Sequence, residues 1–177
     1  MPFEGIKLGV LALQGAFEKH AEICPVPTRH VRYPVELQSC DGLIIPGGES
    51  TTIWKQMEEL DFITAIKEFE GPIFGTCAGL IILVKLGLLD VIVERNGYGR
   101  QINSFLTSLD FKGKPIAALF IRAPRIKSTA PSVQVLSTYE GEPVVVQQGR
   151  FFASTFHPEL TQEVALHNHF LEMCREN

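Results

Sequence analysis

The chain has 177 residues, of which 45% are hydrophobic and 20% charged, and its net charge is −4. This balance is typical of a globular protein and excludes a disordered chain, a coiled coil and a collagen-like repeat. No basic block is present, so we expect no nucleic-acid partner. The longest apolar runs are too short to span a bilayer and residues 1–4 lack a signal-peptide pattern, so we expect no membrane association and a cytoplasmic location.

The first half of the chain alternates predicted strands with predicted helices. Buried apolar runs and turn residues predict the strands 6–13, 30–33, 42–45 and 72–75. The segments between them predict the helices 16–23, 51–60, 62–69 and 78–85. Ser50 is the expected N-cap of the second helix. Such alternation predicts a parallel sheet with helices on both faces.

The second half of the chain is rich in short strands. Glycine and proline turns separate the predicted strands 91–94, 101–109, 116–121, 133–138, 144–147 and 151–155, and a helix over 163–174 closes the chain. The sequence therefore predicts an α/β three-layer sandwich, one domain over residues 1–177, with a mostly parallel central sheet and antiparallel additions. Ligands bind such folds at the carboxyl ends of the parallel strands, so the segments 47–48, 75–79 and 155–159 matter most.

One of the four cysteines, Cys77, lies in a G-x-C-x-G motif between a predicted strand and a predicted helix. A sharp turn of this kind pushes the side chain outward at the top of the sheet, where the helix N-terminus favours a thiolate. The N–H of Ala78 would then point at an oxyanion formed on a substrate. The motif alone leaves a second interpretation open, a tight turn that buries a cysteine.

His157 and Glu159 follow the last predicted strand, separated by Pro158. In an extended segment, residues two apart point to the same side, so Glu159 would orient one imidazole nitrogen while the other acts as a general base. We expect Pro158 to keep the segment extended. Taken alone, the pair also fits a partly buried histidine with a local carboxylate. We assign no role to the remaining histidines and expect no metal site.

The loop 46–50 joins a predicted strand to a predicted helix and contains two glycines. The Gly48 N–H would be a second oxyanion donor, opposite Ala78. Glu49 would hold a substrate ammonium group. Arg95 and Arg122 end predicted strands, where each would either pair with a substrate carboxylate or remain a solvated charge.

Six blocks together resemble the class I glutamine amidotransferases and, among these, the glutaminase subunits of pyridoxal 5′-phosphate synthase. The blocks are VLALQG (10–15), LIIPGGESTT (43–52), FGTCAGLIIL (74–83), VERNGYGRQ (93–101), FIRAP (120–124) and STFHPELT (154–161). They extend over almost the whole chain in the family order, and the fourth and fifth point to the vitamin B6 branch. Segments 24–31 and 84–87 depart from the family pattern, the second by being short.

The resemblance implies that Cys77 is the nucleophile, His157 the general base and Glu159 its orienter. It implies hydrolysis of L-glutamine to glutamate and ammonia through a cysteinyl thioester, with no cofactor. The family's oxyanion positions match Gly48 and Ala78. Its glutamine-binding positions match Gly48, Glu49, Ser50, Arg95, Ile121 and Arg122.

The resemblance also implies a partner. Ammonia would pass to a (β/α)₈-barrel pyridoxal 5′-phosphate synthase subunit within a large hetero-oligomer. Three alternatives stay open: a glutaminase serving another synthase such as imidazole glycerol phosphate synthase, a cysteine peptidase or amidase on a related fold, and a non-catalytic subunit that keeps the fold.

Overall fold

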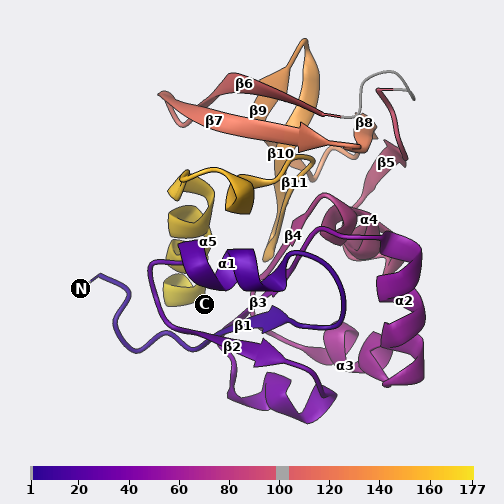
Figure 1. Ribbon diagram of the computed structural model, residues 1–177, viewed down its shortest axis with the longest axis vertical. Coiled ribbons are helices and arrows are strands. Elements are labelled where there is room, and N and C mark those ends of the chain that lie inside the picture. The colour runs from indigo at the N-terminus through magenta and orange to yellow at the C-terminus, as the bar shows by residue number, and fades with distance from the viewer. Residues whose placement is uncertain (1, 99–103) are drawn as a thin grey trace.

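A computed structural model describes residues 2–98 and 104–177 (Figure 1). Its central sheet has seven strands in the order β2-β1-β3-β4-β11-β10-β9. Five neighbouring strands are parallel to one another: β2 (Thr28–Val31), β1 (Leu8–Leu11), β3 (Gly42–Ile45), β4 (Ile73–Thr76) and β11 (Phe151–Ser154). The antiparallel strands β10 (Glu142–Gln148) and β9 (Gln134–Tyr139) extend the sheet at one edge. The described chain thus has the predicted mostly parallel sheet with antiparallel additions.

Helices cover both faces of this sheet (Figure 1). One face carries α2 (Ser50–Glu59), α3 (Phe62–Glu68) and α4 (Ala78–Lys85), and the other carries α1 (Phe17–Ile23) and α5 (Ala165–Glu176). Alternate residues of one strand enter different cores: Leu43 and Ile45 pack toward α2–α4, whereas Ile44 packs toward α5. Because both faces are buried, the inner strands β1, β3 and β4 are buried at every residue and almost wholly apolar, and this explains their continuous hydrophobic runs.

Two antiparallel hairpin-like pairs lie beyond the central sheet. Strand β5 (Val91–Glu94) pairs with β8 (Arg125–Thr129), and β6 (Ser104–Phe111) pairs with β7 (Lys114–Ile121). Both pairs lie toward the end of the molecule at which β4 and β11 finish (Figure 1). They therefore stand beside the carboxyl ends of the parallel strands, where ligands bind in such folds.

Several predicted elements match the structure closely, while others were missed. The predictions 42–45, 78–85 and 91–94 coincide with β3, α4 and β5. Strand β8 and the 3₁₀ helices η1 (Pro34–Ser39) and η2 (Pro158–Leu160) were not predicted. Residues 101–103 of the predicted strand 101–109, and residues 99–101 of the VERNGYGRQ block, lie outside the described residues. No helix in the described part of the chain is long and apolar enough to cross a membrane.

The prediction that Ser50 caps α2 was wrong. Glu49 is the N-cap, and its carboxylate accepts hydrogen bonds from the N–H groups of Thr51 (3.1 Å) and Thr52 (2.8 Å). Ser50 already belongs to the helix and is buried. A glutamate one residue earlier reaches the free N–H groups and adds a negative charge at the positive end of the helix dipole.

Candidate active site

Cys77 stands between β4 and α4 with its backbone in a strained conformation. Its φ is 52° and its ψ is −105°, a region that non-glycine residues rarely adopt. A backbone conformation of this kind destabilises the folded state by on the order of 1–3 kcal/mol, so it persists only where the surrounding structure stabilises it. The Cys77 N–H donates to the Ser154 carbonyl of β11 at 2.9 Å, which ties the turn to the neighbouring strand. The structure thus has the sharp strand-to-helix turn that the motif predicts.

The glycines of this motif serve close packing. A Cβ added to Gly75 would lie 2.5 Å from the Gly79 carbonyl oxygen, and one added to Gly79 would overlap the backbone of Ile45. Neither glycine has a positive φ. They allow α4 to start directly against β3 and β4, and Cys77 alone carries the unusual backbone angle.

His157 and Glu159 are in contact, although not for the predicted reason. His157 Nδ1 lies 2.5 Å from Glu159 Oε1, and both residues are buried. Pro158 opens the 3₁₀ helix η2 and does not keep the segment extended, so the prediction of an extended segment was wrong. A proline suits the first position of a helical turn because it has no N–H to satisfy there. The short turn folds the carboxylate back onto the imidazole.

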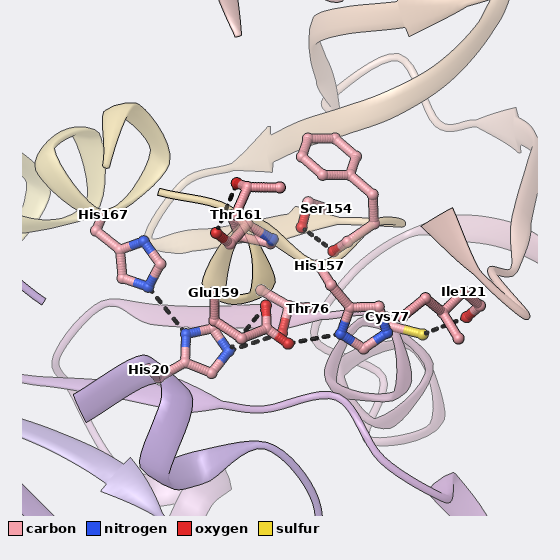
Figure 2. A network of polar contacts seen from close by, with 11 residues as sticks. His20, Thr76, Cys77, Ile121, Ser154, His157, Glu159, Thr161 and His167 are labelled. Carbon is pink, nitrogen blue, oxygen red and sulfur yellow. Dashed lines mark hydrogen bonds and ion pairs between the residues drawn. The ribbon is translucent and has the colours of Figure 1, made fainter. Parts of the chain in front are cut away.

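The His157 imidazole also lies against the Cys77 side chain (Figure 2). Burial alone would lower the pKa of His157, but hydrogen bonds with Cys77 and Glu159, together with their charges, raise it to about 10. At neutral pH the ring is therefore an imidazolium that lies against the Cys77 side chain. The Cys77 Sγ also lies 3.9 Å from the carbonyl oxygen of Ile121, at the end of β7.

A cavity of about 430 Å³ opens over Cys77 and His157. Every residue that the sequence predicts for the oxyanion hole or for glutamine binding lines it: Gly48, Glu49, Ser50, Ala78, Arg95, Ile121 and Arg122. Glu159 does not line it and lies behind the imidazole. The structure thus brings the predicted residues together from segments up to 109 positions apart (48 to 157).

Two polar side chains at the mouth of this cavity are already in contact with each other. The hydroxyl of Thr52 and the backbone N–H groups of Thr52 and Thr51 lower the pKa of the Glu49 carboxyl to about 2. Arg95 lies 3.6 Å from this carboxylate and donates to the Thr51 hydroxyl at 3.3 Å. The Glu49 carboxylate is therefore ionised, is fixed by hydrogen bonds from α2, and lies beside the Arg95 guanidinium.

Hydrogen bonds from the loop after β1 fix the peptide between Gly47 and Gly48. The Ala16 N–H donates to the Gly47 carbonyl at 2.9 Å, and the Gln14 side chain accepts from the Glu49 N–H at 2.9 Å. In a trans peptide the C=O and N–H point in opposite directions, so the Gly48 N–H points away from Ala16. Ala78 is the first residue of α4, so its N–H has no partner within the helix.

Sequence reasoning missed two buried histidines behind this site, His20 and His167. His20 is fully buried and lies 3.6 Å from Glu159 Oε2, and His167 lies 2.9 Å from His20 (Figure 2). No local sequence pattern predicts their role, because the residues that they contact are distant in the sequence. Within residues 2–98 and 104–177, no group of three or more His, Cys, Asp and Glu side chains is arranged to hold a metal ion.

Comparisons with known proteins agree on one family. A model of the SNO glutamine amidotransferase family matches residues 10–176. The chain is 47% identical to a Thermotoga neapolitana protein named pyridoxal 5′-phosphate synthase subunit PdxT, over 96% of this chain and 100% of that protein. It is 44% identical to a Francisella philomiragia protein of the same name, over 95% of this chain and 99% of that protein. A crystal structure described as a glutamine amidotransferase superposes with a TM-score of 0.90 at 40% identity, covering 95% of this chain and 98% of that one.

The fold is therefore the class I glutamine amidotransferase-like α/β fold, as the sequence predicts. Sequence and structure agree over nearly the full length of the chain and of its relatives. The chain belongs to the SNO glutamine amidotransferase family.

Proposed function

We propose that this chain is the glutaminase subunit of a pyridoxal 5′-phosphate synthase. The observation that carries the proposal is the contact of the Cys77 side chain with an imidazole that Glu159 holds, at the floor of a cavity lined by the predicted glutamine-binding residues. The relatives named PdxT favour this synthase over other amidotransferases. A peptidase or a non-catalytic subunit has no comparable support.

The proposed reaction begins with Cys77. Its thiolate attacks the side-chain amide carbon of glutamine and forms a C–S bond, which gives a tetrahedral oxyanion. His157 then donates its proton to the amide nitrogen, the C–N bond breaks and ammonia leaves. A water molecule, deprotonated by His157, attacks the resulting thioester and releases glutamate and the thiolate. The net change is glutamine plus water to glutamate plus ammonia.

Two backbone N–H groups would stabilise the oxyanion. Ala78 supplies the unpaired N–H at the start of α4, and Gly48 supplies the second from the loop fixed by Gln14 and Ala16. In comparable acyl-transfer sites, loss of one such donor costs about 3–4 kcal/mol of transition-state stabilisation.

The charges at the cavity mouth suit the two charged ends of an amino acid. Glu49 is held ionised and would pair with the substrate ammonium group, while Arg95 and Arg122 would pair with its carboxylate. Ser50 and Ile121 also line the cavity. We propose these five residues, with Gly48, as the glutamine-binding set.

We further propose that ammonia passes to a (β/α)₈-barrel synthase subunit within a hetero-oligomer. In this proposal residues 1–177 act as one glutaminase domain in the cytoplasm, without a cofactor. The relatives bear a synthase-subunit name, and this supports an assembly of more than one kind of chain.

The test is an assay of glutamate and ammonia formation from glutamine, with and without an added barrel synthase subunit. A glutamine-analogue electrophile should label Cys77 in the unmodified protein, and the Cys77→Ala variant should take up no label and release no ammonia. Coenzyme formation in the mixture tests the synthase assignment. Absence of glutamine hydrolysis and of labelling in both mixtures would refute the proposed function.

A further inference from the structure

Glu159 makes its second polar contact with a buried histidine of α1. His20 has no solvent exposure, and its Nε2 lies 3.1 Å from Thr76 Oγ1 and 3.6 Å from Glu159 Oε2. Its Nδ1 lies 2.9 Å from Nε2 of His167 on α5. Figure 2 shows the row that results, from His167 through His20 to Glu159 and on to His157 and Cys77. Four separate segments of the chain meet in this row.

The burial of His167 fixes the positions of the protons. His167 Nδ1 is buried with no hydrogen-bond partner in the part of the chain that the structure describes. A buried N–H without a partner costs about 1–3 kcal/mol, whereas an unpaired lone pair is tolerated better. His167 therefore carries its proton on Nε2 and donates to His20 Nδ1. The proton of a neutral His20 must then be on Nε2, facing Thr76 and Glu159.

His20 is neutral in this setting. Burial, followed by the charges of His167 and His157, holds the pKa of His20 well below its usual range. The titratable groups that face it are His167, His157 and Glu159, and Thr76 adds a hydroxyl. His20 thus offers one directed N–H and no second positive charge beside the imidazolium of His157.

We propose that His20, oriented by His167, is a positioning residue for the Glu159 carboxylate. Glu159 Oε1 contacts His157, while Oε2 is buried and has no hydrogen bond within the described residues. The Nε2–H of His20 donates to Thr76 Oγ1 at 3.1 Å and lies 3.6 Å from Glu159 Oε2. A donor so close to Oε2 limits rotation of the carboxylate, which keeps Oε1 in line with His157 Nδ1. The 3.6 Å separation is longer than a formed hydrogen bond, and hydrogen bonds of catalytic groups are often long before substrate binds. This inference rests on the proposed glutaminase function.

The first test compares three variants by glutaminase kinetics, with the synthase subunit present. The His20→Leu substitution removes the N–H and should lower kcat about tenfold, because a small misplacement of a supporting group slows the reaction. The KM for glutamine should stay within about twofold, because neither His20 nor Glu159 lines the cavity. His20→Gln places an amide N–H near the former Nε2 and should keep kcat within about threefold of the unmodified protein.

His169→Leu is the matched control. His169 lies two residues from His167 on the same helix, and burial lowers its pKa to about 4, but its ring contacts Gln147 and not the site. Its removal should leave kcat unchanged. A loss in this variant equal to that in His20→Leu would attribute both effects to general loosening of the core and would overturn the proposal.

A double substitution then separates positioning from stability. If His20 acts only through Glu159, adding His20→Leu to Glu159→Gln should lower kcat by less than about twofold further. Losses that multiply would show that His20 acts elsewhere. Should His20→Leu fail to fold, His167→Leu and His167→Gln replace it, since only the second retains a donor to His20. Equal kcat in those two variants would overturn the proposal.

The same assay distinguishes failure of this inference from failure of the proposed function. If the unmodified protein does not hydrolyse glutamine, the proposed function is lost. If it hydrolyses glutamine and His20→Leu does so at the same kcat, only the positioning role is lost.

Discussion

At the scale of single residues, close packing around the reacting groups explains Gly47, which lies against the His157 ring. A Cβ added to Gly47 would overlap the imidazole and would lie 3.4 Å from the Cys77 Cβ. The residue that lies against both reacting side chains is therefore glycine, the smallest one. The sequence indicates a glycine loop here, but only the structure separates the two glycines: Gly47 makes room for His157, and Gly48 makes room for Gln14.

We predict that Gly47→Ala displaces His157 and lowers kcat for glutamine by roughly 100-fold, because a shift of about 1 Å in a reacting group can cost that much. The expected loss of stability is small, because the cavity gives the ring room to move. Steady-state kinetics together with a thermal melt would check both parts. Unchanged kcat would show that the ring adapts without cost.

The strained backbone at Cys77 leads to a second prediction. Replacing alanine by glycine usually destabilises a protein through the entropy of the unfolded chain. At the Cys77 φ of 52° the glycine variant should instead be the more stable of the two, because glycine adopts that angle without strain. We expect Cys77→Gly to be more stable than Cys77→Ala by about 1 kcal/mol, with both variants inactive. Urea unfolding of the pair measures the difference, and a less stable glycine variant would argue against stored strain.

The contact of His157 with Glu159 predicts an unequal division of labour. Loss of the general base in His157→Gln should lower kcat by about 10²–10⁴-fold. Glu159→Gln should cost less, because Glu159 only orients the ring and its replacement still offers an oxygen to Nδ1. Parallel kinetics on the two variants test this order. An equal or larger loss in Glu159→Gln would show that the carboxylate does more than orient.

His20 marks the limit of residue-level prediction. Its contacts reach Thr76, 56 positions away, and His167, 147 positions away. No spacing rule for a single helix or strand connects residues so far apart, so the sequence presents His20 as one more histidine in an early helix. Predicting the position of His20 next to Glu159 would have required the strand pairing of the whole sheet.

At the scale of elements, the apolar pattern predicted the helices and strands that are buried. It failed for elements whose structure depends on polar contacts. Strand β3 and helix α4 are apolar runs and were found with correct ends. Strand β8 has one buried residue, Ile126, between the half-buried Arg125 and the exposed Lys127, so its sequence resembles a loop. The turn at Pro158 was mistaken for extended chain because a proline after a strand is compatible both with extended chain and with the first position of a helical turn. In the structure the His157 N–H donates to the Leu119 carbonyl of β7, and η2 begins at the next residue.

The cap of α2 gives a prediction at this scale. Glu49→Ala removes an acceptor for the N–H groups of Thr51 and Thr52 and should lower the free energy of unfolding. Glu59→Ala is the control, because this exposed glutamate ends the same helix, where its charge opposes the dipole. It should not destabilise. Urea unfolding of both variants decides, and equal stabilities would show that the cap is dispensable.

At the scale of the whole molecule, the parallel register forms the site. Thr76 of β4 lies opposite Ser154 of β11, so the residues that follow the two strands emerge side by side. Cys77 follows one strand directly, and His157 follows the other by three positions. The sequence predicted this meeting because parallel strands end at one edge of a sheet. It did not predict how the core on the α1 and α5 side supports the site, because that core encloses polar histidines.

These histidines predict how stability depends on pH. Burial lowers the pKa of His167 and of His169 to about 4, and holds that of His20 well below its usual range. The unfolded chain binds protons at these rings near pH 6.5, before the folded chain does. The contribution of these histidines to the free energy of unfolding is therefore complete above pH 6.5 and falls as the pH drops toward 4.

His157 has the opposite effect on the alkaline side. Contacts with Cys77 and Glu159 raise its pKa to about 10 against the effect of burial. Its contribution to the free energy of unfolding is therefore complete below pH 6.5 and is lost as the pH rises toward 10.

We therefore predict a maximum of the melting temperature near pH 6.5, with a decline on both sides. The His157→Gln variant should lose the alkaline decline that begins above pH 6.5, whereas the effect of Cys174, whose pKa burial raises to about 12, begins only near its unfolded pKa of about 9. The His169→Gln variant should reduce the acid decline, because glutamine does not titrate. Melting curves between pH 4 and pH 10 test both arms separately. An alkaline decline that is unchanged in His157→Gln would mean that the imidazolium contributes nothing to the stability of the folded state.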